Sequence, residues 1–169
     1  MPGTAAPITR DKFVPLIDLT RGAEAGTYDW APIDLSTVFE MAYNPTTETY
    51  SYICYPNDTT EIASYAPSME QEIKITRDNP IYDFMLAYMR EMPTGDAAKV
   101  PLMIVYPAKD TGAPTEADVW DEAMIAPGSI NTIDGKLTFT LNFNGDRVPG
   151  TVAGIGTDTV TFTPSGEDE

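Results

Sequence analysis

The sequence contains no histidine and only one cysteine, Cys54, among its 169 residues. Histidine is the usual general base near neutral pH and the commonest metal ligand, so serine–histidine and cysteine–histidine mechanisms are excluded. A reactive thiol needs an open, electropositive setting, whereas Cys54 stands in the run Tyr-Ile-Cys-Tyr. We therefore expect Cys54 to be a small buried hydrophobe within a strand. We expect no enzymatic activity and no cofactor.

Basic residues are also scarce, because 10 Lys and Arg stand against 26 Asp and Glu, for a formal net charge of −16. Affinity for nucleic-acid backbones comes mainly from Lys and Arg, so tight binding of DNA or RNA is disfavoured. The charge is compatible with nucleic acid that passes by without binding. It also suits a surface that merely keeps the protein soluble, and composition leaves both interpretations open.

Long apolar runs are missing as well. No segment is long and apolar enough to span a bilayer, and no basic stretch followed by an apolar run comes after Met1. We therefore expect neither a secretory signal nor insertion into a membrane. The acidic residues between 110 and 122 could supply oxygen ligands for calcium, but their spacing matches no calcium-binding loop, so we predict no metal site.

Period-two alternation is the main pattern that the sequence does contain. It is clearest over residues 136–143, where Leu and Phe alternate with Lys, Thr and Asn, and it recurs over residues 68–76. Asp134-Gly135 and Asn144-Gly145 are typical of tight hairpin turns, so we expect a hairpin at each end of the 136–143 strand. Further strands are predicted at 27–33, 37–43, 49–56, 100–106, 118–126, 129–133, 146–153 and 158–163, with a loop at 108–117.

One segment has the period of a helix. Asp78 or Asn79 can cap it and Pro80 suits its first turn. Ile81, Phe84, Met85, Tyr88 and Met89 then form one apolar stripe, and Pro93-Thr94-Gly95 ends it. We predict a helix at about residues 79–92.

These elements predict a mainly β fold, an antiparallel β-sandwich or barrel of two sheets with one flanking α-helix and an extended hairpin arm. We divide the chain into an N-terminal arm (1–26), a β-sandwich domain (27–163) and an acidic tail (164–169). Residues 13–19 of the arm are expected to form a short strand or a docking segment.

The hairpin predicted over residues 37–56, with its turn at 44–48, is apolar on both faces. Tyrosine is enriched in the centres of interfaces, so this hairpin is a candidate subunit contact; a central hairpin of the core is the alternative. The candidate interface residues are Phe39, Met41, Tyr43, Tyr50, Tyr52 and Tyr55.

Residues 50–107 carry a more specific pattern. Tyr65-Ala66-Pro67 leads into the 68–76 strand, Asp78-Asn79-Pro80 opens the helix, Met92-Pro93-Thr94-Gly95 follows it, and the apolar strand 101–107 ends in proline. This order resembles the tail tube (major tail) proteins of long-tailed, non-contractile bacteriophages. Strands 118–126 and 136–153 agree with the family in order only.

The resemblance implies a structural virion protein that assembles into stacked hexameric rings, forming a hollow tube through which DNA leaves the capsid. It implies assembly in the host bacterial cytoplasm, with copies of the chain and tape-measure, tail-tip and tail-terminator proteins as partners. Tubes inside a contractile sheath, secretion-system tubes and tail terminators have related folds and stay open as alternatives. The 37–56 hairpin would be the arm that reaches a neighbouring subunit or ring.

A tube that conducts DNA needs an acidic or neutral polar lumen, because a cationic wall would hold a polyanion. The candidate lumen residues are Thr138, Thr140 and Asn142 on one strand, or alternatively Glu70 and Glu72 on another. Either face could instead point outward. A monomeric β-sandwich binding module is the competing function, carbohydrate-binding or adhesin-like, with Trp30 and Trp120 as a candidate sugar platform.

Overall fold

A computed structural model describes residues 9–23, 27–109, 113–157 and 159–166. The chain forms antiparallel sheets and one α-helix, α1 (Pro80–Glu91), with short 3₁₀ turns at Arg10–Lys12 and Gly95–Ala98. The strands are β1 (Val14–Asp18), β2 (Trp30–Pro32), β3 (Met41–Ala42), β4 (Pro45–Tyr50), β5 (Thr59–Tyr65), β6 (Ser68–Lys74), β7 (Leu102–Pro107), β8 (Pro114–Trp120), β9 (Met124–Asn131), β10 (Lys136–Asn142), β11 (Val148–Ala153) and β12 (Thr161–Pro164).

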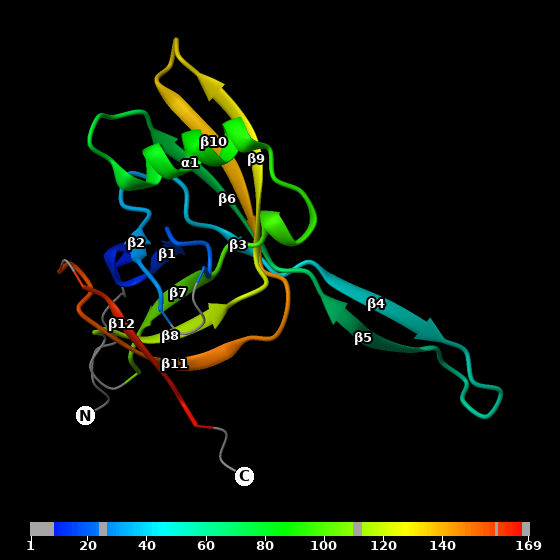
Figure 1. Cartoon of the computed structure of the whole chain (residues 1–169). Helices are drawn as coiled ribbons and strands as arrows, with labels where there is room; N and C mark the ends of the chain where they lie inside the picture. The colour runs from blue at the N-terminus through cyan, green and yellow to red at the C-terminus, as the bar shows by residue number, and fades with distance from the viewer. Residues whose placement is uncertain (1–8, 24–26, 110–112, 158, 167–169) are drawn as a thin grey trace.

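Two sheets form the body of the molecule, and a third forms an arm that projects from it (Figure 1). The larger sheet has the strand order β12-β11-β8-β7-β1-β2, and the smaller has the order β3-β6-β10-β9. The arm is the two-stranded sheet β4-β5. The larger sheet curls into a half-barrel. The predicted fold class is therefore confirmed.

The four-stranded sheet has one apolar face because its strands alternate. Met69 and Ile73 on β6 and Leu137, Phe139 and Leu141 on β10 are buried in the main core. The helix α1 covers this face and adds Ile81, Met85 and Tyr88 to the same core. Burial of such side chains contributes about 1.5–3 kcal/mol each, so the alternation drives the packing of the helix on the sheet.

Local signals set the ends of α1 where the sequence predicts them. The side chain of Asn79 accepts a hydrogen bond from the backbone N–H of Tyr82, and Pro80 occupies the first helical position. The helix ends at Glu91, and the capping residue after it, Met92, adopts a left-handed conformation, φ 49°. The predicted helix at 79–92 is confirmed within one residue at each end.

The curled six-stranded sheet is apolar on both sides. One face contributes Ile17, Leu102 and Ile104 to the main core. The other face forms a second cluster centred on Leu16, Trp30, Met103, Val105, Ala117, Val119 and Val152. Central strands that are buried on both faces read as continuous apolar runs, which explains the run predicted at 100–106.

The predicted hairpin at 37–56 is wrong in its turn. Residues 44–48, expected to be the turn, lie in the strand β4 or directly before it, and the connection to β5 runs over residues 51–58. The arm is therefore β4–β5, while β3 is a two-residue strand beside β6. Pro56-Asn57-Asp58, which the prediction did not use as a turn signal, lies in this connection. Asn44, expected in the turn, instead has a left-handed φ of 44° at the base of the arm.

Two other predicted connections differ. The single strand expected at 118–126 is two strands of different sheets, β8 and β9, with a turn at Asp121-Glu122, and β8 begins inside the loop predicted at 108–117. The hairpin expected at Asn144-Gly145 does not form, because β10 pairs with β6 and β9 whereas β11 pairs with β8 and β12. The chain crosses from one sheet to the other there.

The segment predicted as a short strand or docking segment, 13–19, forms β1 between β7 and β2 in the larger sheet. The buried carboxylate of Asp18 fixes the following turn, since it accepts hydrogen bonds from the backbone N–H groups of Thr20, Gly22 and Asp29. Residues 1–8 and 24–26 of the predicted N-terminal arm, 110–112 of the predicted loop and 167–169 of the predicted acidic tail lie outside the described residues. The three-part division of the chain stays a prediction.

Candidate assembly surfaces

The second face of the four-stranded sheet is polar, and it unites the two alternatives for the lumen. In the register of β6 with β10, Thr138 lies opposite Glu72 and Thr140 lies opposite Glu70. Asn142 follows opposite Ser68. All five predicted lumen residues therefore share one surface, here called the polar face. Their role in a lumen stays a prediction.

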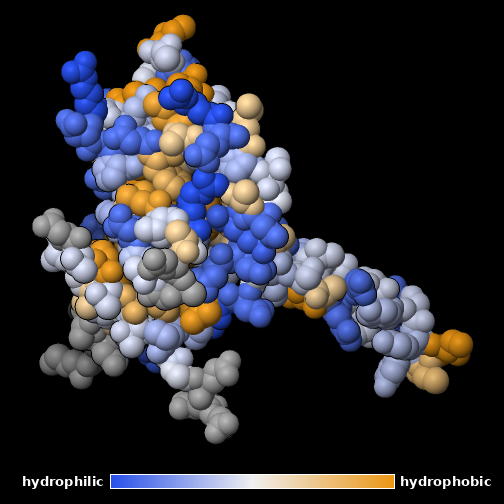
Figure 2. All heavy atoms as spheres, in the orientation of Figure 1, coloured by the Kyte–Doolittle hydropathy of each residue, from blue (hydrophilic) through white to orange (hydrophobic). Residues whose placement is uncertain are grey.

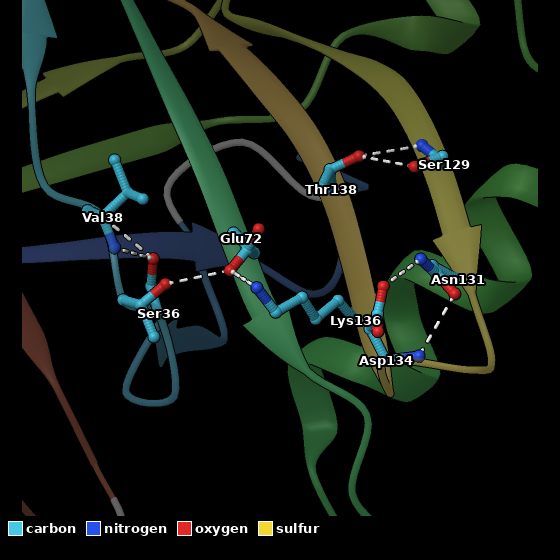
Figure 3. Close-up of polar contacts among 9 residues, drawn as sticks. Ser36, Val38, Glu72, Ser129, Asn131, Asp134, Lys136 and Thr138 are labelled. Atoms are coloured by element: carbon cyan, nitrogen blue, oxygen red, sulfur yellow. Dashed lines mark hydrogen bonds and ion pairs between the residues drawn. The ribbon is translucent and has the colours of Figure 1, made fainter.

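An ion pair crosses this face. The Nζ of Lys136 lies 2.7 Å from Oε1 of Glu72, and the hydroxyl of Thr37 donates to the same oxygen at 3.3 Å (Figure 3). The hydrogen bond with Lys136 lowers the pKa of Glu72, against a smaller opposing effect of desolvation. The same bond raises the pKa of Lys136. Both groups are accordingly charged at neutral pH.

Next to the ion pair, a bulge brings β9 very close to β10. The backbone N–H of Ser129 donates to Oγ1 of Thr138 at 3.0 Å, and the two hydroxyls lie 3.1 Å apart (Figure 3). A β-carbon at Gly128 would lie 2.6 Å from that hydroxyl and 2.8 Å from the Thr138 carbonyl oxygen. Only glycine fits this approach, so the bulge between Leu137 and Phe139 depends on it.

The sheet also has an open edge. Among the described residues, β9 pairs with β10 along its length and with nothing on its outer side except a single bridge from Met124 to Lys99. Residues 126–131 are exposed. Pro127 interrupts the row of N–H groups, as is common in edge strands, which leaves 128–131 able to pair with another strand.

The arm is exposed throughout. Every residue of β4 and β5 is exposed, and the two strands pair with each other. Apolar side chains nevertheless line it. Ile53 is fully exposed at its far end. Tyr52 stacks on Tyr50, with ring centroids 5.9 Å apart, and meets Tyr55 edge to face at 6.3 Å. Figure 2 shows this apolar end far from the body. Exposed apolar side chains do not stabilise a monomer. They stabilise a complex when a partner covers them, so such a surface is typical of an interaction site.

The six predicted interface residues fall into two groups. Tyr50, Tyr52 and Tyr55 belong to the arm and its tip, and Tyr43 lies at its base. Phe39 and Met41 belong to the body instead. Phe39 packs on Phe13 with ring centroids 5.8 Å apart, and Met41 lies opposite Met69 on β6.

Because the turn was predicted at the wrong place, the prediction also missed other exposed apolar residues of the arm. Ile53, Ile62 and Tyr65 are exposed there, and a turn placed at Pro56-Asn57-Asp58 would have indicated them. The prediction for Cys54 is wrong as well. It lies exposed in the loop at the end of the arm, because the strand expected to bury it ends at Tyr50.

A groove lies between the base of the arm and the six-stranded sheet. Its two adjoining hollows, of about 700 and 610 Å³, share Tyr43, Tyr106, Asp118 and Arg147. The larger one is mostly apolar, with Met41, Tyr65, Pro67 and Trp120 in its wall. An ion pair lies in the groove, with Nη1 of Arg147 3.2 Å from Oδ2 of Asp118. The pKa of Tyr106, which lines both hollows, is raised, mainly because its hydroxyl is buried.

Within the described residues, no three acidic or cysteine side chains cluster closely enough to hold a metal ion, and none of the helices found there is long and apolar enough to cross a membrane. The prediction of Trp30 and Trp120 as a sugar platform is wrong, because both indoles are buried, at 7 % and 6 % exposure. Trp120 packs in the main core and Trp30 packs in the second apolar cluster.

Solved structures with the same arrangement of elements come from phage-like injection machines. A chain in the six-fold-symmetrised baseplate of the anti-feeding prophage (AFP) aligns with a TM-score of 0.53 and 10 % identity, covering 86 % of this chain and 97 % of that chain. A chain in the sheath/tube terminator structure of PVC, an extracellular contractile injection system, aligns with a TM-score of 0.52 and 9 % identity, covering 87 % and 99 %. The chain shares its fold with components of these assemblies. At such identities the likeness concerns the fold alone.

Neither protein-family models nor curated proteins give a match to the sequence. The fold comparison agrees with the phage-tail type of protein that the sequence resembles. The comparison does not support a non-contractile tail in particular, since the PVC assembly is contractile.

Proposed function

We propose that this protein is a structural, non-enzymatic subunit that assembles with copies of itself into stacked hexameric rings, forming a tube of the phage-tail type. DNA passes through the tube during ejection without specific binding. The long non-contractile tail that the sequence resembles is the finer form of this proposal, and a tube inside a contractile sheath is its close relative. The protein would then reside in the virion tail after assembly in the host cytoplasm.

The observation that carries the proposal is the four-stranded sheet with one buried face, one polar face and an open edge. Helix α1 and the core cover the apolar face, so the sheet needs no partner there. The outer edge of β9 at residues 128–131 is free to pair with a neighbour. Sheets that join edge to edge around a ring would enclose a channel, and the polar face is the one that can stay in contact with water.

The charges of the polar face suit a conduit. On β6 and β10, Glu70 and Glu72 balance Lys74 and Lys136, and the remaining groups of this face are hydroxyls and an amide. The pairing of Lys136 with Glu72 reduces the attraction that this lysine would exert on phosphate. A wall without net positive charge neither holds a polyanion nor requires a particular sequence of it.

The arm supplies the contact between neighbours in this proposal. Every residue of its two strands is exposed, so the arm does not pack in the core. The arm is rich in tyrosine, a residue type that is enriched in the buried centres of protein interfaces. Tape-measure, tail-tip and tail-terminator proteins are the further partners that the family resemblance implies. Contacts to the tail-tip and tail-terminator proteins would lie at the ends of the tube.

Negative-stain electron microscopy of the purified protein over a concentration series, together with light scattering, tests the proposal. Rings or hollow tubes of uniform width are the expected result. If a tip complex is needed for nucleation, short tubes should form after seeding with tail tips. A protein that stays monomeric under all these conditions contradicts the proposal and favours the monomeric binding module, for which glycan binding at the tyrosine-lined groove is the next assay.

A further inference from the structure

The hairpin that joins β9 to β10 ends in an exposed isoleucine held in a fixed position. Ile133 is 94 % exposed. Oδ1 of Asn131 accepts hydrogen bonds from the backbone N–H groups of Ile133 and Asp134, at 3.0 and 3.2 Å. The amide of Asn131 also donates to Oδ2 of Asp134 at 2.6 Å (Figure 3). The turn therefore presents Ile133 with little freedom, and this apex is called the Ile133 tip.

The groove at the base of the arm lies at the opposite end of β10 and of its neighbour β6. The register pairs Lys136 with Lys74 at the Ile133 tip and Asn142 with Ser68 at the other end. There, Pro67 accepts a hydrogen bond from the backbone N–H of Phe143 and forms part of the groove wall. The Ile133 tip and the groove are thus the two ends of one strand pair (Figure 1).

The two ends are complementary. The tip offers one apolar side chain beside the exposed carboxylate of Asp134. The groove offers an apolar wall of Met41, Tyr65, Pro67 and Trp120, with Arg147, whose side chain is 59 % exposed, at its rim. An apolar apex with an adjacent anion matches an apolar hollow whose rim carries the ion pair of Arg147 with Asp118, in which the guanidinium is the more exposed partner.

We infer that the Ile133 tip of one copy docks in the groove of a second copy, head to tail. This inference rests on the proposed function. If sheets join edge to edge within a ring, the ends of β6 and β10 face the rings on either side, so the contact stacks one ring on the next. Because the two surfaces differ, the contact is heterologous and continues from copy to copy instead of closing on a dimer.

The first test is a substitution. Ile133→Asp should raise the concentration needed for tube formation about tenfold or more, because a charged side chain replaces an apolar one that the contact between copies would bury. Isolated rings are expected to remain. Met92→Asp is the control, since Met92 is also exposed, at 76 %, but lies at the end of α1. Tubes of Ile133→Asp that form at the wild-type concentration overturn the inference and leave the proposed function standing. A wild-type protein that forms neither rings nor tubes, even after seeding with tail tips, overturns both.

The second test is covalent. In a Cys54→Ser background, Ile133→Cys combined with Tyr65→Cys should give a ladder of disulfide-linked oligomers after oxidation of assembled tubes, while each single cysteine variant gives none. The absence of a ladder from intact tubes counts against the inference. A ladder from Tyr65→Cys with the native Cys54 would place the end of the arm in the groove instead, which also overturns it.

Discussion

Lys136 and Glu72 form an ion pair across two neighbouring strands, with Nζ and Oε1 2.7 Å apart on the polar face of the four-stranded sheet. The pair joins the two strands that the sequence offers as alternative linings. The pair can form only in this register of β6 with β10, so the charge distribution on the polar face depends on that register.

The pH dependence of this pair follows from its pKa shifts. The pKa of Glu72 is lowered, so its contribution to stability is complete above its unfolded-state value, near 4.5, and is lost as pH falls through the folded-state value. The pKa of Lys136 is raised, so its contribution is complete below 10.5 and is lost as pH rises through the folded-state value. A double-mutant cycle of Glu72→Gln and Lys136→Gln should show full coupling between these limits and a coupling that declines as pH falls below 4.5. Since the pair is exposed, the change in melting temperature should stay below about 3 °C. Coupling that does not change between neutral pH and the acid limit of the folded protein contradicts the assignment.

Reversal of the acidic charges on the polar face should make the tube retain DNA. In the variant Glu70→Lys/Glu72→Lys, we expect tubes of normal width that bind double-stranded DNA, with an affinity that falls steeply as salt rises. Ejection of DNA from assembled particles should be impaired. Asp83→Lys/Asp96→Lys makes the same change in net charge away from the polar face and should behave as wild type. Normal infectivity of particles that carry the Glu70→Lys/Glu72→Lys variant would contradict the assignment of this face to the lumen.

Removal of the arm should abolish assembly without unfolding the body. Asn44 and Ala66 lie close together, since the side-chain amide of Asn44 donates to the carbonyl of Ala66 at 3.0 Å. A short Gly-Ser turn can therefore replace residues 45–65, none of which is buried. Circular dichroism should show a melting temperature within a few degrees of wild type, and light scattering should show a monomer at all concentrations. Tubes formed by the armless protein would show that the arm is not the contact.

Cys54 offers a probe of assembly that needs no substitution. Because it is exposed in the loop at the end of the arm, it should react with a maleimide at the rate of a free thiol in the unassembled protein. Covering of the arm in a tube should slow this reaction by an order of magnitude or more, with Cys54→Ser as the blank. Equal rates before and after assembly would show that the end of the arm stays open.

Tyr88 links α1 to the rest of the core. Its buried hydroxyl has a single proton, which the carbonyls of Ala98 and Ile125 share at 2.9 and 3.2 Å from the hydroxyl oxygen. Tyr88→Phe keeps the ring but leaves buried carbonyls short of a donor, so urea unfolding should show a loss of about 1–2 kcal/mol. Tyr82→Phe, on the same helix but only half-buried, is the control and should cost less.

Sequence reasoning reached the elements whose signals are local. The alternation over 68–76 and 136–143 and the Asn79-Pro80 cap depend on residues a few positions apart, and β6, β10 and α1 form where these signals predict. The charge balance and the absence of histidine likewise limited the chemistry before any fold was known.

The tertiary structure alone decided what depends on distant partners. Asn144-Gly145 is a valid turn signal, yet β10 finds better partners in β6 and β9, and the chain crosses to the other sheet. Cys54 and the tyrosines of the arm look like core residues, but they are exposed because β4 and β5 leave the body and pair with each other. The polar face exists only because the register sets Thr138 opposite Glu72, and contacts between strands more than 60 residues apart determine that register.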